Sequence, residues 1–244
     1  SSDLLILGGC GPMGLGAVSY ALAFENKPKR VVVTDISDDR VERAKQVISI
    51  EDAKAAGVEL HYVNTAAMED QEKELMDITE GHGYDDVFVY VPITGVAELG
   101  NKLLAYDGCM NLFAGPTDPK FSANMNLYDC HYSRTKILGS TGGTIEDMKE
   151  AINKAASKEI KPAVMITHIG GIDAVAETTK NLPDIPGGKK LTYMQFDMPL
   201  TAIDDFRKLG ETDPLYAKLA DACDKHNGLW NAEAEKILFD HFGA

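Results

Sequence analysis

The feature that most constrains this chain is the segment from residue 4 to residue 25, where a short apolar run leads into a glycine-rich turn and a helix-like pattern. The run Leu-Leu-Ile-Leu is typical of a buried parallel strand, and the residues after the turn repeat apolar positions with helical spacing. Gly9, Gly11 and Gly14 form the pattern G-x-G-x-x-G. In such a turn the first glycine permits the bend, the second leaves room for a pyrophosphate, and the third lets the helix pack on the strand. The residues predicted to contact the phosphates are Gly9, Gly11, Pro12, Met13 and Gly14.

A second buried strand supports a dinucleotide site. Residues 30–35 have the sequence Arg-Val-Val-Val-Thr-Asp, and Asp35 lies 21 residues after Gly14. An acid at this distance typically accepts hydrogen bonds from the ribose hydroxyls of an adenine dinucleotide. Strand, glycine turn, helix, strand and acid in this order favour a dinucleotide-binding domain over a glycine turn in an unrelated α/β domain. The residues expected at the adenosine ribose are Asp35, Ile36 and Arg40.

The sequence beyond Asp35 alternates helix-like and strand-like segments joined by connections of ordinary length. Apolar positions recur with helical spacing in one kind of segment and form short continuous runs in the other. This alternation predicts an α/β fold with a doubly wound, mostly parallel Rossmann sheet and a C-terminal helical extension. The expected helices of this part begin after Ser37 and at residues 69–80, 96–106 and 144–158, and the expected strands span residues 58–63, 86–91, 109–114 and 136–140.

Three loops follow the later strands of this predicted sheet. Ligands of open α/β sheets bind outside the carboxyl ends of the strands, so these loops are expected to face the nicotinamide half of the dinucleotide. The small residues of the last loop, at 139–142, fit a strand end beside a cofactor better than a nucleophile, because the G-x-S-x-G elbow is absent. The loop residues predicted to bind the cofactor are Val91, Pro92, Thr94, Ala114, Gly115, Ser140 and Thr141.

The residues after Pro162 depart from the regular alternation. A strand–helix–strand pattern over residues 164–193 is followed by helical patterns at 201–209, 214–227 and 231–242. We therefore expect an NAD(P)-binding Rossmann domain at residues 1–166. A C-terminal strand–helix–strand return with a helical tail is expected at residues 167–244.

Composition excludes several other classes of protein. The net charge of −14 argues against nucleic acid or an anionic membrane surface as a partner. No apolar run approaches the ~20 residues needed to cross a bilayer. The four cysteines are scattered without a C-x-x-C pair, which indicates neither a disulfide framework nor a zinc ribbon. A reducing, cytoplasmic location is expected.

Histidine and cysteine neighbours do not form a convincing metal or nucleophile site. Cys223 and His226 are neighbours on one predicted helix and His241 lies on the next, whereas zinc needs three or four converging ligands. Cys130 and His131 lack a third partner that would orient a base. We expect neither a metal ligand nor a catalytic residue within this chain.

Several motifs resemble the medium-chain, zinc-type alcohol dehydrogenase superfamily over residues 4–193. They are Gly-Cys-Gly-Pro-Met-Gly at 9–14, Val-Thr-Asp at 33–35 and Leu-Gly-Ser-Thr-Gly-Gly at 138–143. The segments at 166–171, 181–183 and 187–189 are similar to the sorbose-1-phosphate reductase-like branch of that superfamily. The tail Gly-Leu-Trp-Asn-Ala-Glu-Ala-Glu at 228–235 is similar to the same branch.

The resemblance implies hydride transfer between NAD(P) and a small-molecule alcohol, polyol or sugar phosphate that a zinc ion polarises. Members of the superfamily carry an N-terminal GroES-like domain whose cysteine, histidine and glutamate side chains bind the catalytic zinc. The sequence reaches its first predicted strand at Leu4, so those ligands are expected to lie outside it. We therefore expect this chain to be the cofactor-binding part of a longer enzyme, inactive by itself, with zinc in the missing domain. The sequence leaves the oligomeric state open, a homo-oligomer included.

Two alternatives belong to other classes. The first is a stand-alone dinucleotide-binding module without catalysis. The second is a metal-free oxidoreductase that would use Tyr132 and Lys136, whose spacing matches a Tyr-x-x-x-Lys pair. These two residues span a predicted turn and strand, where a spacing of four does not bring side chains onto one helical face.

The acid at the end of the second strand also predicts the preferred cofactor. The carboxylate of Asp35 would accept from the ribose of NAD but repel the 2′-phosphate of NADP. Ser37 and Arg40 offer donors to a phosphate, so NADP is the alternative. We expect NAD to bind more tightly.

Overall fold

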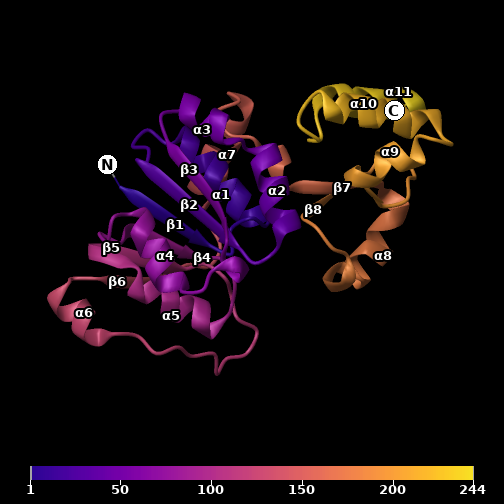
Figure 1. Cartoon of the computed structure of the whole chain (residues 1–244). Coiled ribbons are helices and arrows are strands. Elements are labelled where there is room, and N and C mark those ends of the chain that lie inside the picture. The colour runs from indigo at the N-terminus through magenta and orange to yellow at the C-terminus, as the bar shows by residue number, and fades with distance from the viewer. Residues whose placement is uncertain (1, 244) are drawn as a thin grey trace. The chain divides into compact units, whose positions relative to one another are not determined.

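The computed structural model describes residues 2–243, which form two compact units dividing after Ile160 (Figure 1). The domain boundary expected at residues 166/167 stays a prediction. No helix within residues 2–243 has the length and apolar character needed to span a membrane.

The first unit is built on one six-stranded sheet in which every neighbouring pair is parallel. Its strand order is β3-β2-β1-β4-β5-β6, so the chain reverses its direction of progress between β1 and β4. This is the doubly wound Rossmann arrangement, and the predicted fold class is confirmed. The strands are β1 (Asp3–Leu7), β2 (Arg30–Asp35), β3 (Glu59–Asn64), β4 (Tyr84–Val89), β5 (Leu104–Leu112) and β6 (Lys136–Gly139).

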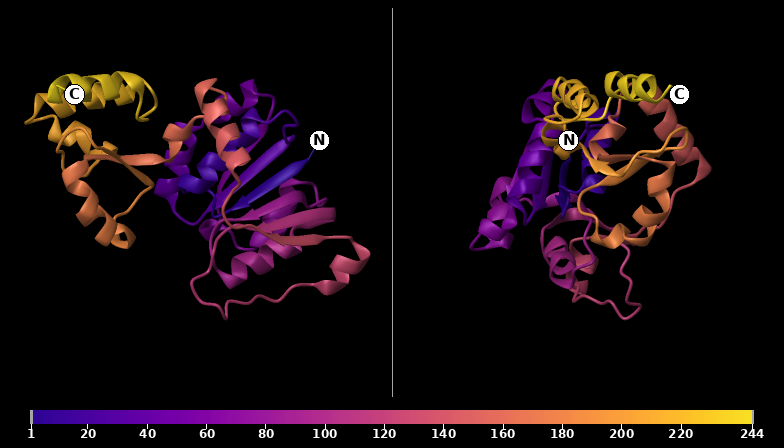
Figure 2. Two further views of the ribbon diagram at one scale, coloured as in Figure 1. Left: turned by 180° about the vertical axis from the view of Figure 1, so that it is seen from behind. Right: turned by 90° about the vertical axis from the view of Figure 1, so that its right-hand side faces the viewer.

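Helices cover the sheet on both faces, with α4 and α5 on one side and α1 and α7 on the other (Figures 1 and 2). Several begin at capping side chains that the sequence supplies: Ser37 accepts from the Arg40 amide, and Thr144 and Asp147 form a complete capping box. The helices are α1 (Pro12–Ala23), α2 (Asp38–Val47), α3 (Ile50–Ala55), α4 (Gln71–Ile78), α5 (Thr94–Lys102), α6 (Leu127–Tyr132) and α7 (Ile145–Ala156).

The helix expected over residues 96–106 is wrong in its last part. α5 ends at Lys102, and Leu104 already pairs with Tyr84 as the first residue of β5. Leu103 between them is completely buried, and the register of the pair shifts beyond Tyr84. The apolar pair Leu103–Leu104 fits helical spacing, but pairing with β4 satisfies the backbone groups of the buried segment.

The second unit contains a three-stranded sheet in the order β8-β7-β9. β7 (Ile166–Gly171) is parallel to β8 (Lys189–Tyr193) and antiparallel to β9 (Thr201–Ala202). The helix expected over residues 201–209 is therefore wrong at its start, because Thr201 and Ala202 pair with β7. The helices are α8 (Val175–Lys180), α9 (Phe206–Leu209), α10 (Pro214–Asp224) and α11 (Ala232–Phe242); α10 and α11 lie side by side in Figure 2.

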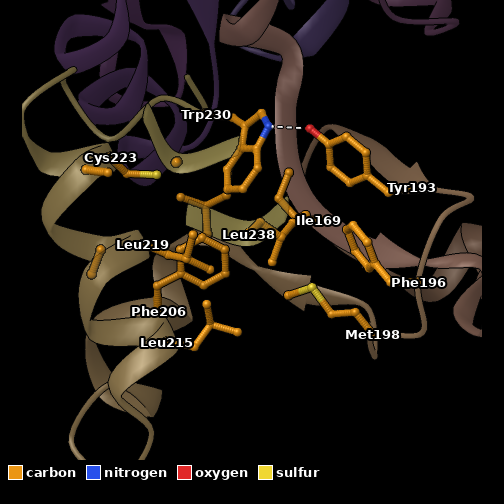
Figure 3. Packing of buried hydrophobic residues seen from close by; sticks show 14 residues of the cluster. Ile169, Tyr193, Phe196, Met198, Phe206, Leu215, Leu219, Cys223, Trp230 and Leu238 are labelled. Carbon is orange, nitrogen blue, oxygen red and sulfur yellow. Dashed lines mark hydrogen bonds between the residues drawn. The ribbon is translucent and has the colours of Figure 1, made fainter. Parts of the chain in front are cut away.

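An aromatic and aliphatic core holds the second unit together (Figure 3). Trp230 Nε1 donates a 2.8 Å hydrogen bond to the Tyr193 hydroxyl, which donates in turn to Glu235 Oε1 at 2.6 Å. Burial, together with the contact to Glu235, raises the pKa of the Tyr193 hydroxyl. The polar atoms of both rings are thus satisfied although the rings are packed inside the core. The same cluster encloses Leu219 completely.

Replacing Leu219 by alanine should lower the free energy of unfolding of this unit by about 3 kcal/mol, because the buried side chain leaves a cavity. Trp230, the one tryptophan of the chain, lies in the same core, so its fluorescence during denaturant unfolding reports the change. The exposed neighbour Lys218 provides the control, since Lys218→Ala should change the midpoint little. Equal effects of the two substitutions would contradict this description of the core.

Candidate cofactor-binding site

The turn between β1 and α1 is packed so tightly that side chains do not fit at two of its glycines. A Cβ at Gly14 would lie 2.1 Å from the carbonyl oxygen of Gly9, and a Cβ at Gly9 would lie 2.5 Å from Ile6 Cγ2. At Gly11, by contrast, a Cβ would meet no atom within 4 Å. The first and third glycines therefore close the turn, and the second faces open space.

That open space lies at the beginning of α1. Gly11 is the N-cap residue and Pro12 is the first residue of the helix. The first turn carries no acidic residue, and no side chain caps it. Its backbone N–H groups and the positive end of the helix dipole are therefore available to an anion. The contacts predicted there for Pro12 and Met13 stay predictions.

The acid predicted at the ribose lies beside this turn, as the last residue of β2. Asp35 is only 4% exposed, and its Oδ1 accepts from the amides of Ile36 (2.9 Å) and Ser37 (3.2 Å). Arg40 Nη1 lies 3.8 Å from the same oxygen, while the Arg40 side chain is 65% exposed. Backbone donors, more than the exposed arginine, therefore fix the orientation of the carboxylate.

The later strand-end loops enclose a cavity of about 480 Å³ at the carboxyl ends of β4, β5 and β6. Its lining includes all the predicted loop residues except Thr94, which instead begins α5 and donates from Oγ1 to the Ser122 carbonyl at 3.1 Å. The lining residues are Val89, Val91, Pro92, Ala97, Leu112, Phe113, Ala114, Gly115, Pro116, Phe121, Gly139, Ser140, Thr141 and Gly142.

Two aromatic lining residues, Phe113 and Phe121, were not predicted from the sequence. Phe113 stacks on Tyr90 with ring centroids 4.5 Å apart, and Phe121 belongs to the irregular loop before α6. Phe113 lies at the end of a predicted strand, which is a signal that could have found it, whereas no local pattern marks Phe121. Which loop side chains face the cavity depends on how that loop folds back on α5.

The turn and the cavity are direct neighbours. A Cβ at Gly8, whose φ is +69°, would lie 2.5 Å from Cγ1 of Val91, and Val91 lines the cavity. Gly8 follows β1 and Val91 follows β4, the two strands between which the sheet order reverses. Ligands of open α/β sheets bind at this reversal, because the loops on either side diverge there.

The other chemical candidates do not assemble. Burial and the nearby Asp35 raise the pKa of the Cys10 thiol to about 12, so this thiol in the turn stays protonated at neutral pH. Tyr132 ends α6, whereas Lys136 begins β6 and donates to the Asp107 carbonyl and carboxylate, at 2.8 Å each. Within residues 2–243 no three histidine, cysteine, aspartate or glutamate side chains converge as a metal site.

A family model described as zinc-binding dehydrogenase matches residues 12–157. The chain belongs to this family, the zinc-type medium-chain alcohol dehydrogenase superfamily. The predicted sorbose-1-phosphate reductase-like branch is supported by the similarity of the chain to a reductase of that name. The predicted family membership is thus confirmed.

Relatives and solved structures agree with this membership. The chain is 47% identical to mannitol-1-phosphate 5-dehydrogenase of Aliivibrio fischeri, over 98% of this chain and 56% of that protein. It is 40% identical to L-sorbose 1-phosphate reductase of Klebsiella pneumoniae, over 97% and 54%. The chain thus spans a little over half the length of these relatives.

The fold also matches a short chain alcohol dehydrogenase of Escherichia coli CFT073 whose crystal structure contains NADH. The TM-score is 0.63 at 18% identity, covering 80% of this chain and 52% of that one.

The packing of the turn predicts that substitutions at Gly14 and at Gly11 change the free energy of unfolding by different amounts. Gly14→Ala should lower the free energy of unfolding by about 2 kcal/mol or more, because the new Cβ would overlap the Gly9 backbone. Gly11→Ala should change it by less than about 0.5 kcal/mol, since the added methyl group enters open space. Chemical denaturation of both variants measures the difference, and equal stability losses would contradict the geometry.

Proposed function

We propose that this chain binds NAD(H) and presents the nicotinamide for hydride transfer to or from an alcohol, polyol or sugar phosphate within a zinc-dependent oxidoreductase. One observation carries the proposal: the open backbone at Gly11, the buried Asp35 carboxylate and the cavity beyond Val91 adjoin along one edge of the sheet. An extended dinucleotide needs three such surfaces, with the phosphate site between the ribose acid and the nicotinamide cavity. The printed names of the relatives support the substrate class.

Each surface fits one part of the cofactor. The uncapped first turn of α1 would bind the pyrophosphate, and Asp35 would accept from the adenosine ribose. The cavity, with walls that include Val91, Leu112 and Phe121, would surround the nicotinamide ring and exclude water from it. The cofactor supplies the hydride, and this part of the chain supplies its binding and orientation.

The zinc of the family is not assigned to any residue described. The chain's own contribution lies in holding the dinucleotide so that one face of its nicotinamide is presented. Binding should therefore be measurable without added metal.

Calorimetric titration with NADH in the presence of a chelator tests the proposal. NADH should bind and should raise Tm by mass action, since the folded state alone offers the site. In Gly11→Ala the methyl group occupies the space of the pyrophosphate, so the affinity should fall at least tenfold although the fold is retained. Absence of binding by the unmodified chain at millimolar NADH would refute the proposal.

A second test concerns the choice between the two nicotinamide cofactors. NAD should bind at least tenfold more tightly than NADP, because the buried Asp35 carboxylate is held by two amides and repels the 2′-phosphate. Asp35→Ser should reduce the difference in affinity between NAD and NADP. It removes the repulsion of the 2′-phosphate of NADP and also the hydrogen bonds of the carboxylate to the ribose of NAD. Dissociation constants for both cofactors at one ionic strength measure this preference.

The matched substitution Arg40→Ala separates the two candidate determinants. It should leave the affinity for NAD nearly unchanged, since the Arg40 side chain is exposed and comes no nearer than 3.8 Å to the Asp35 carboxylate. Tighter NADP binding by the unmodified chain, lost in Arg40→Ala, would show instead that Arg40 recognises the ribose.

A further inference from the structure

We propose that Thr34 is a positioning residue for the cofactor: its hydroxyl holds the glycine turn in the open conformation that receives the pyrophosphate. This inference rests on the proposed function. From the sequence, Thr34 is predicted only to belong to a buried strand and to the motif Val-Thr-Asp at 33–35. The structure shows that its side chain and its carbonyl group both face the turn.

Two hydrogen bonds connect Thr34 to the turn. The Gly9 amide donates to the Thr34 carbonyl at 2.8 Å, and the Gly8 amide donates to Thr34 Oγ1 at 3.3 Å. The parallel pairing of β1 with β2 ends at Ile6 and Val33. The side chain of Thr34 thus supplies an acceptor where the regular ladder stops.

Packing leaves the turn little freedom to find another acceptor. Gly8 is pressed toward Val91, and Gly9 lies between Ile6 and Val33, with no room for a Cβ at either glycine. Thr34 itself is 3% exposed. If the hydroxyl were replaced by a methyl group, the Gly8 amide would face an apolar neighbour, and regaining a partner would require the turn to shift.

The neighbouring residue makes this contact relevant to binding. Asp35, next in sequence, is held by the amides of Ile36 and Ser37. The last two residues of β2 therefore hold the phosphate turn, through Thr34, and supply the ribose acid, Asp35. A ligand that needs both surfaces at once binds in proportion to the fraction of molecules in which the turn is in place.

Thr34→Val, which keeps the shape and removes the acceptor, tests the proposal with ADP-ribose as the probe. Calorimetry should show about tenfold weaker binding, and Thr34→Ser should restore affinity to within about twofold of the unmodified chain.

Thr79 offers a matched control at the opposite edge of the sheet. It is also 3% exposed, and its hydroxyl likewise accepts from a glycine amide of positive φ, that of Gly83, at 3.0 Å. Both Thr79→Val and Thr34→Val should lower Tm, yet Thr79→Val should leave the affinity for ADP-ribose within about twofold of that of the unmodified chain.

Two results of the binding test would overturn the proposal: unchanged affinity for ADP-ribose in Thr34→Val, or an equal loss of affinity in Thr79→Val, which would indicate general destabilisation.

If Thr34→Val does not fold, hydrogen exchange of the Gly8 amide in the unmodified chain tests the proposal instead. Strong protection supports the hydrogen bond, and exchange at the rate of an exposed loop overturns it. A chain that binds neither NADH nor ADP-ribose would overturn the proposed function as well, whereas ligand binding with unchanged Thr34→Val affinity would refute this inference alone.

Discussion

The close approach of Gly14 to the backbone of Gly9 is the contact on which the candidate site depends. Because no side chain fits between them, α1 starts directly over the end of β1. The uncapped backbone amides at the beginning of α1 therefore face the open space at Gly11. The same compact turn brings Gly8 against Val91. Because Val91 lines the cavity, the predicted phosphate site and the cavity are neighbours.

The sequence was sufficient to predict the six strands of the first unit, because continuous apolar runs and turn residues mark them locally. It was not sufficient where distant pairing decides the outcome. Leu104 fits a helix by spacing, yet becomes a strand because β4 lies beside it. Thr201 and Ala202 pair with β7 for the same reason, and their sequence alone favours a helix. Boundaries of this kind are set by backbone hydrogen bonds between segments far apart in the chain.

The candidate site shows the same division between local and non-local information. The turn and Asp35 could be predicted because their residues stand at fixed distances in a short segment. The cavity lining was predicted in part, since strand ends are visible in the sequence, but Thr94 turns toward Ser122 and Phe121 turns toward the cavity. The role inferred for Thr34 depends on a contact across two strands, which no local pattern reports.

The central place of β1 in the sheet has a consequence for how the first unit folds. The backbone of Leu5 and Ile6 is paired on both sides only when β2 on one side and β4 on the other have both been added. The pairing with β4 joins Leu4 to Asp86 and Leu7 to Val89, contacts of long sequence separation that require a large loop to close. β1 is therefore paired on both sides only after most of the sheet has been added, and folding of this unit belongs to the slow class governed by non-local contacts.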